Sequence, residues 1–235
     1  MRSMDSLAYT VKRSPRRTTV SIRINPDKTI IILAPADLSD ARISEVALQK
    51  ASWIRKQFDE LDRCEYRAGK HYFDEGEIFL YLGAELKLRH AAGRGGVTVD
   101  DGIISVAIPP GLRECRERRA CVEKQLLHHY RSRAHEMLRQ RAFTLGAMHG
   151  LEPHFVATKD YVSRWGCCFA DKRIYFNWKL IMAPQHIIDY VVIHELCHLQ
   201  VANHSQAFWN LVGKIMPDWR RRRKWLRRNG HGLIF

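Results

Sequence analysis

The sequence predicts an α+β protein with a β-rich first part, residues 1–109, and a mostly helical second part, residues 110–235. Three observations support this division. Apolar and polar residues alternate with the two-residue period of strands in much of the first part. In the second, apolar residues recur every three or four positions, as on one face of a helix. Pro109-Pro110-Gly111 is the strongest break in the chain. The two parts are also compatible with one compact unit.

The first part begins with short strands and one helix. Alternation predicts strands at Tyr9–Val11 and Thr19–Ile24, and a turn at Asn25–Lys28 leads into a returning strand, Thr29–Leu33. Pro35 ends that strand. A helix follows, and its apolar stripe consists of Ile43, Val46, Ala47, Ile54, Phe58 and Leu61.

Two further hairpin-like stretches complete the first part, Phe73–Leu88 and Val97–Ile108. The second contains the turn sequence Asp100-Asp101-Gly102. After the proline break, apolar residues at helical spacing predict one long amphipathic helix from Arg113 to about Leu145, with a basic outer face.

The remaining elements carry the chemistry. Short strands are expected at Phe155–Thr158 and Ile174–Asn177, around a loop with Arg164-Trp165-Gly166. Pro184 is well placed to open a helix that reaches about Ala202. A final helix is expected to start near Ser205 and to continue past Pro217 into a basic tail.

The charge balance narrows the classes of partner. The chain has 39 Lys and Arg against 25 Asp and Glu, a formal net charge of +14. Such a surface attracts polyanions, which include nucleic acids and nucleotides. No apolar run approaches the ~20 residues that span a bilayer, and the N-terminus lacks a signal-peptide core. We therefore expect a cytoplasmic protein without a membrane contact, in which the six cysteines are reduced thiols.

His194-Glu195-Leu196-Cys197-His198 is the most informative motif. Residues four apart lie on one face of a helix, so His194 and His198 can direct two imidazoles at one metal ion. Glu195 is about 100° around the helix from His194. It can therefore contact an attacking water as a general base without binding the metal, as in zinc peptidases.

A catalytic zinc site usually has three protein ligands and one open position. His204 is the best candidate for the third ligand, provided that the chain leaves the helix at Val201-Ala202-Asn203 and turns back. A known zinc-site spacing of this kind has Gly where Val201 stands, so the turn must differ here. Downstream carboxylates and His231 remain weaker alternatives.

These residues carry a family resemblance. The segment Ile188–Leu199, followed by Asn203-His204-Ser205 and Phe208-Trp209, resembles the YgjP-like metallopeptidase-type family, which is related to the SprT and WLM zincins. The resemblance extends upstream to Arg164–Cys168 and to Ile174–Asn177.

The resemblance implies a minimal zincin fold, in which a short sheet packs on the active-site helix. It also implies one Zn²⁺ on His194, His198 and His204, with Glu195 as the catalytic base. The family commonly reads W-G-S-C-S, whereas this chain has Trp165-Gly166-Cys167-Cys168-Phe169. The difference bears on substrate specificity, and Cys167 is a candidate for a fourth, inhibitory ligand.

Other residues are candidates for contacts with the substrate or a partner. Arg164, Trp165 and Asn177 are candidates for substrate binding, and Arg164 could stabilise a developing negative charge. The arginines of the C-terminal run suit phosphate groups, because a guanidinium matches the geometry of phosphate oxygens. The candidates for a nucleic-acid or polyanion contact are Arg220, Arg221, Arg222, Arg223 and Arg227.

The favoured function is a zinc-dependent peptidase. One alternative is a metal-dependent nucleoside triphosphate pyrophosphohydrolase, since an activated water can also attack phosphorus. A second is a DNA-associated protease, or a non-enzymatic zinc-bearing nucleic-acid binder. The non-enzymatic form fits least, because structural zinc usually has four protein ligands, often thiolates. The substrate, which is a peptide, a protein or a nucleotide, and the oligomeric state are not determined by the sequence.

Overall fold

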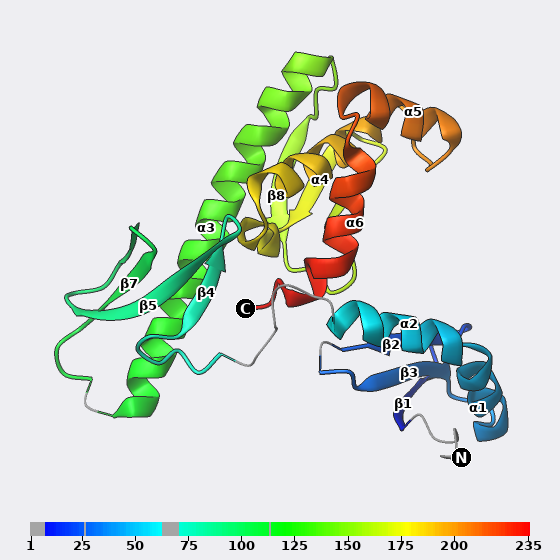
Figure 1. The fold of residues 1–235 in the computed structure, drawn as a ribbon, viewed down its shortest axis with the longest axis horizontal. Coiled ribbons are helices and arrows are strands. Elements are labelled where there is room, and N and C mark those ends of the chain that lie inside the picture. Colours follow the sequence, from blue (N-terminus) through cyan, green and yellow to red (C-terminus); the bar gives the residue numbers. More distant parts are fainter. Residues whose placement is uncertain (1–7, 26, 63–70, 113) are drawn as a thin grey trace. The chain divides into compact units, whose positions relative to one another are not determined.

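The structure is a computed structural model that describes residues 8–25, 27–62, 71–112 and 114–235 (Figure 1). Helices and strands mix along the chain, which confirms the α+β class. The chain forms two compact units, residues 1–68 with 227–232, and residues 69–226 with 233–235. The break at Pro109-Pro110-Gly111 lies within the second unit, between a strand and the longest helix.

The first unit contains a three-stranded sheet in the order β1-β3-β2. Its strands are β1 (Tyr9–Ser14), β2 (Ser21–Ile24) and β3 (Ile30–Pro35). β2 and β3 form the predicted antiparallel hairpin, whereas β1 pairs with β3 in parallel. The parallel pair was not expected, because it joins strands that are not neighbours in the sequence.

Two helices follow these strands where one was predicted, α1 (Asp40–Gln49) and α2 (Ala51–Asp62). The chain turns at Lys50, whose backbone N–H bonds to carbonyl oxygens of the last turn of α1. The turn lets both helices pack on β3. The buried cluster that results consists of Ile30, Ile32, Ala34, Ile43, Ala47 and Ile54.

The second unit begins with a four-stranded sheet in the order β4-β5-β7-β6. The strands are β4 (Ile78–Tyr81), β5 (Ala84–Ala92), β6 (Val97–Asp100) and β7 (Ile103–Ile108). Both predicted hairpins are confirmed, and β5 joins them by pairing with β7 in parallel.

The turns of the two hairpins place consecutive residues in the left-handed region, as tight hairpin turns require. Leu82 and Gly83 have φ of 51° and 81°, and Asp101 and Gly102 have 40° and 73°. The first turn also bonds to the segment that precedes the helix with His194: Leu82 N–H donates to the Ile181 carbonyl at 2.7 Å.

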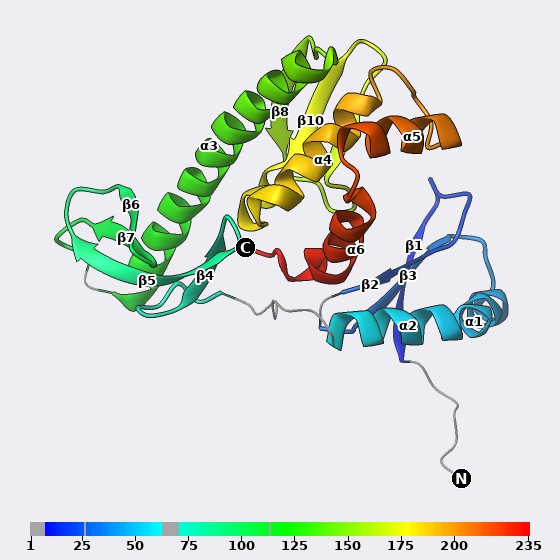
Figure 2. The ribbon, with the colours of Figure 1, turned by 45° about the horizontal axis from the view of Figure 1, so that its top comes forward.

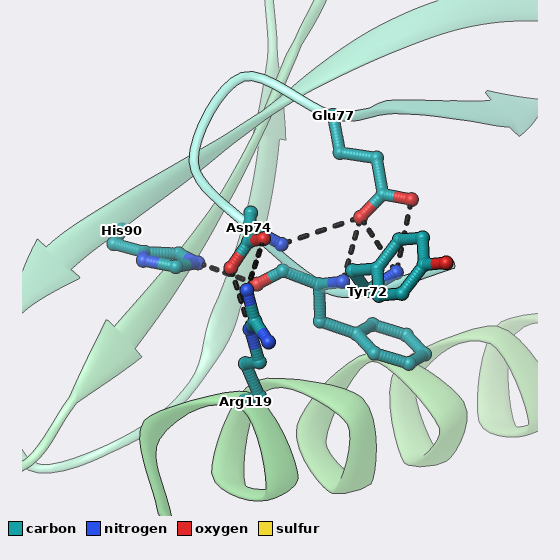
Figure 3. Close-up of polar contacts among 6 residues, drawn as sticks. Tyr72, Asp74, Glu77, His90 and Arg119 are labelled. Atoms are coloured by element: carbon teal, nitrogen blue, oxygen red, sulfur yellow. Dashed lines mark hydrogen bonds and ion pairs between the residues drawn. The ribbon is translucent and has the colours of Figure 1, made fainter. Parts of the chain in front are cut away.

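Figure 3 shows how polar contacts join the loop before β4 to the longest helix. The Glu77 carboxylate accepts hydrogen bonds from the backbone N–H groups of Tyr72, Phe73 and Asp74. Arg119 holds the Asp74 carboxylate with two bonds of 2.7 and 2.5 Å. His90 Nε2 lies 3.1 Å from the Phe73 carbonyl oxygen. The loop is therefore fixed by its own carboxylates.

The longest helix, α3 (Cys115–His149), is the long amphipathic helix that the sequence predicted. It packs in turn on β7, on the 3-10 helix η1 (Trp178–Met182) and on β8 (Phe155–Lys159). Its buried residues are four positions apart, which gives one continuous apolar stripe: Val122, Leu126, Tyr130, Ala134, Leu138, Ala142 and Gly146.

A second small sheet of this unit packs on α4 (Gln185–Cys197), the helix that carries His194 and Glu195. Its order is β8-β10-β9, with β8 (Phe155–Lys159) and β10 (Arg173–Asn177) at the predicted places. β9 (Gly166–Cys168) was expected to be loop, and it pairs with β10 in antiparallel fashion. The 3-10 helix η1 (Trp178–Met182) then leads into α4 (Gln185–Cys197). α3 packs on β8, α4 packs on β9, and the two helices pack together (Figure 2).

The C-terminal segment differs from the prediction of one helix. It forms α5 (Gln206–Ile215), α6 (Trp219–Asn229) and the short 3-10 helix η2 (Gly230–Gly232). Met216, with φ −136° and ψ 86°, is extended because the proline ring of Pro217 excludes the helical conformation for the residue before it. Within the described ranges, no helix has the length and hydropathy needed to cross a membrane.

Candidate metal centre and active site

Three imidazoles meet beside the end of α4. His194 lies in its last turn, and His198 is its C-cap residue. His204 comes from the segment between α4 and α5, and its Nε2 lies 3.0 Å from His194 Nε2 and 3.2 Å from His198 Nε2. Among the described residues, these three histidines are the one group whose ligand atoms converge as a metal site requires. His231, the alternative third ligand, lies outside the group.

The turn that brings His204 back towards His194 and His198 does not require a glycine at residue 201. Residues 198–201 continue from α4 through backbone bonds to the carbonyls of Glu195, Leu196 and Cys197. Val201 is not among the described residues with positive φ. Its carbonyl oxygen lies 3.0 Å from His198 Nδ1. A proton on that nitrogen satisfies the carbonyl and leaves the Nε2 lone pair of His198 available for a metal ion.

Two aromatic residues of α5, Phe208 and Trp209, pack against the three imidazoles. The ring of Phe208, on α5, is completely buried and lies 4.4 to 4.9 Å from all three imidazole centroids. Trp209 stacks on His204 with a centroid distance of 5.6 Å, and on Trp219 at 4.3 Å. Rings held in this way cannot easily turn away from one another.

The three nitrogens fit a metal ion. With Zn–N bonds of about 2.05 Å, a tetrahedral site separates ligand nitrogens by roughly 3.3 Å, close to the 3.0 and 3.2 Å seen here. A proton on His204 Nε2 could bond to only one of the two facing nitrogens, whereas a cation accepts all three lone pairs. Burial, followed by the charges of His198, His204 and Arg223, lowers the pKa of His194 to about 3. At neutral pH this imidazole is therefore uncharged and able to bind a metal.

Glu195 lies on α4 beside this cluster and is only 6% exposed. Burial raises the pKa of its carboxyl group to about 8, against the opposing effects of the Cys168 backbone N–H and the Arg164 charge. A pKa near the working pH is what a proton shuttle needs.

Gly166 gives Glu195 its space. A Cβ atom at position 166 would lie 2.5 Å from Glu195 Cγ and Oε1 and 2.7 Å from Cδ. No real Cβ comes so close to other heavy atoms, so β9 can approach the carboxylate only because residue 166 is glycine. β9 is also an edge strand of its sheet. An extended edge therefore runs directly past Glu195.

A cavity of about 400 Å³ opens over these groups. Its walls come from β9 and the loop before it, from α4, and from the segment that carries His204. Tyr190 and Val191, one helical turn before His194 and Glu195, also line it.

Two of the three predicted substrate-binding residues, Arg164 and Trp165, line this cavity, and Asn177 does not. The Arg164 guanidinium lies over the ring of Tyr161 at 5.7 Å, rather than over Trp165. The side-chain amide of buried Asn177 donates to the carbonyls of Tyr161 and Arg164 at 2.9 and 3.2 Å. These bonds place Asn177 behind the loop, where it fixes the loop's position.

Cys167, which stands where the family pattern has Ser, lines the cavity together with Cys168, which matches the pattern, whereas the other departure, Phe169, does not line it. Cys167 Sγ lies 3.6 Å from Arg164 Nη1 and does not belong to the histidine cluster. Burial, followed by the charge of Glu195, raises the pKa of the Cys168 thiol to about 11. All five described cysteines are free thiols, and Cys64 lies outside the described residues.

The arginine run separates into individual roles. Arg222 bonds to the Asp218 carboxylate and to the His186 carbonyl, each at 2.9 Å, so it is part of the fold. Arg221 is 3.5 Å from Asp218, and Arg220 lies over the ring of buried Trp219 at 4.5 Å. The guanidinium of Arg223 lies 4.7 Å from the ring of Trp209, which stacks on His204 of the histidine cluster. The polyanion contact of this run, which included Arg227, stays a prediction.

Sequence reasoning missed several groups of this site. The close approach of Gly166, the packing of Phe208 against the imidazoles and the position of Arg223 depend on segments that are distant in sequence. Tyr190 could have been found, because it precedes His194 by the same four residues that separate His194 from His198.

Comparisons with known proteins agree with this geometry. A family model described as YgjP-like, metallopeptidase domain matches residues 18–229, which include every residue of the histidine cluster and Glu195. Searches of curated proteins and of solved structures found no match.

Proposed function

The chain belongs to the YgjP-like metallopeptidase family, whose chemistry implies a divalent metal, and we propose on this basis that it is a zinc-dependent peptidase. The observation that carries the proposal is the edge strand β9 beside Glu195 and three converging imidazoles. An edge strand can pair with an extended peptide and present one of its carbonyl groups to the site.

His194, His198 and His204 would hold the metal through their Nε2 atoms. A bound Zn²⁺ lowers the pKa of water towards neutrality and polarises a carbonyl group. Glu195 accepts the proton of the attacking water on its carboxylate and then donates it to the leaving nitrogen. Its burial keeps bulk water from competing for that proton. The backbone of β9 orients the peptide, and the Arg164 guanidinium attracts an anionic group of the substrate.

One observation favours the second candidate, a nucleoside triphosphate pyrophosphohydrolase. Arg164 lines the cavity and Arg223 lies over Trp209, which stacks on His204, so both arginines are near the histidine cluster and could hold phosphate groups. However, the next basic residues along the chain, Lys172 and Arg173, do not line the cavity. Arg173 instead pairs with Asp171 at 2.6 Å. The peptidase remains the better fit.

The experiment that tests the function compares wild type with Glu195→Gln, and uses the exposed Glu152→Gln as the matched control. Zinc content is measured first, followed by hydrolysis of an unfolded protein, with and without DNA, and of a nucleoside triphosphate panel. We expect one zinc in all three proteins and peptide cleavage that only Glu195→Gln loses. Phosphate release that depends on Glu195, without peptide cleavage, would replace the peptidase with the second candidate.

A further inference from the structure

Tyr190 is a buried residue of α4, and its hydroxyl group makes no hydrogen bond that stabilises the described part of the fold. The residue is 4% exposed and lines the cavity. Among residues 8–25, 27–62, 71–112 and 114–235, no group hydrogen-bonds to its hydroxyl, and the hydroxyl oxygen is not among the completely buried unpaired polar atoms, so it is open to the cavity. Buried Tyr130, for comparison, donates to the Leu80 carbonyl at 2.9 Å. A hydroxyl group that faces a cavity without a protein partner can donate a hydrogen bond to a ligand there.

The position of Tyr190 suits the reacting carbonyl. It precedes His194 by one helical turn, so both side chains leave α4 on the same face. The two rings meet edge to face with centroids 6.0 Å apart. β9 lies on the other side, where Gly166 contacts Glu195. A peptide paired with the free edge of β9 would therefore have Glu195 and the histidines beneath it and the Tyr190 hydroxyl at its side.

Arg223 supplies a positive charge on the same side. Trp219, Arg223 and Leu226 follow one another on α6 at spacings of four and three, and therefore share a face. Trp219 packs on Trp209, and Leu226 lines the cavity. Arg223 lies over Trp209 and has no carboxylate partner among the described residues. Burial is the main cause of the lowered pKa values of His194 and His204 and of the raised pKa of Tyr190; the charge of Arg223 adds to the first two shifts and opposes the third, so it lies near all three groups.

We propose that the Tyr190 hydroxyl donates a hydrogen bond to the scissile carbonyl oxygen as negative charge develops there, and that Arg223 stabilises this charge from the rim of the cavity. The inference rests on the proposed peptidase function. As the water oxygen bonds to the carbonyl carbon, the π pair moves onto the carbonyl oxygen, and the water proton goes to Glu195. The phenol keeps its own proton. Tyr190 is then a catalytic residue, and Arg223 is a residue that acts through charge and position.

The test uses Tyr190→Phe, Arg223→Gln and Arg223→Lys in the zinc-loaded full chain. The matched control is Arg139→Gln on α3, because the exposed Arg139 lies over Phe143 as Arg223 lies over Trp209 and does not line the cavity. Zinc content and the melting temperature should not change, since Tyr190→Phe removes only an unbonded hydroxyl. We expect kcat on a peptide substrate to fall roughly 100-fold in Tyr190→Phe and roughly 10-fold in Arg223→Gln. KM should stay within about twofold, and Arg223→Lys should recover part of kcat.

A binding measurement separates this inference from the peptidase proposal. Inorganic phosphate, a tetrahedral oxyanion, is titrated into each zinc-loaded protein and followed by tryptophan fluorescence. We expect the Kd to rise about 10-fold in Tyr190→Phe and Arg223→Gln but not in Arg139→Gln. That result supports the anion-stabilising pair even if the wild type cleaves no peptide. Unchanged phosphate affinity in both variants, or an effect on KM alone, would overturn the proposal whether or not the protein is a peptidase.

Discussion

The close approach of β9 to Glu195 predicts an unusually large effect for Gly166→Ala. The new Cβ would lie 2.5 to 2.7 Å from three atoms of the Glu195 side chain, whereas carbon atoms in contact are normally about 3.5–4 Å apart. Residue 166 does not have positive φ, so alanine meets no backbone strain and the contact with Glu195 is the whole effect. An overlap of about 1 Å must be relieved by movement of β9 or of the carboxylate. Overpacking of this size costs about 1–3 kcal/mol.

The same movement affects the chemistry. A misplacement of about 1 Å in a reacting group can lower a rate about 100-fold. We therefore expect Gly166→Ala to keep its zinc, because the histidines are not touched, and to lose about 100-fold in kcat. Thermal or urea unfolding measures the stability cost, and peptide hydrolysis measures kcat.

A double-mutant cycle with Glu195→Ala identifies the cause. That substitution deletes Cγ, Cδ and Oε1, the three atoms that the new Cβ would meet. Gly166→Ala should then cost about 1–3 kcal/mol less in the Glu195→Ala background than in wild type. If the two changes are additive within about 0.5 kcal/mol, the close approach does not limit residue 166 and the reasoning is wrong.

Three further predictions concern the metal, the pH dependence and the support of α4. His204→Ala should weaken zinc binding by at least ~100-fold in a competition assay with a chelator, and unchanged affinity would move the third ligand elsewhere. In metal-free protein, burial holds the pKa of Glu195 at about 8 when folded against 4.5 as its ordinary value. The folded state thus binds the proton more tightly, and wild type loses stability as pH rises from about 4.5 to 8. Glu195→Gln should lack this loss. The difference in unfolding free energy, variant minus wild type, should therefore increase between pH 4.5 and 8 by an amount on the order of a few kcal/mol. A difference that stays constant with pH would contradict the raised pKa. Arg141→Met should lower the unfolding free energy by about 1–3 kcal/mol, measured in urea, because the half-buried Asp189 on α4 loses its two bonds to Arg141, of 2.8 and 2.7 Å. A loss below about 0.5 kcal/mol would show that this ion pair does not support α4.

Local rules predicted most of the elements. The hairpins, α3, β8 and β10 follow from periodicity and turn residues within each segment, and they appear where the sequence places them. The errors have non-local causes or weak local signals. β9 has only three residues, too few for an alternating pattern, and it exists because β10 provides its hydrogen-bond partners. The α5–α6 break does have a local signal, Pro217, whose effect on Met216 the sequence prediction underestimated.

The sequence alone determined which residues can hold a metal through α4. The spacing of His194, Glu195 and His198 implies their relative directions, because each helical residue turns the chain by about 100°. Tertiary structure decided everything that depends on contacts between segments. It placed the His204 Nε2 against the other two, and it placed Gly166 against Glu195 and Arg223 beside Tyr190. Helical spacing fixes directions within one element, whereas these contacts depend on how β9, α5 and α6 pack around α4, which no local pattern contains.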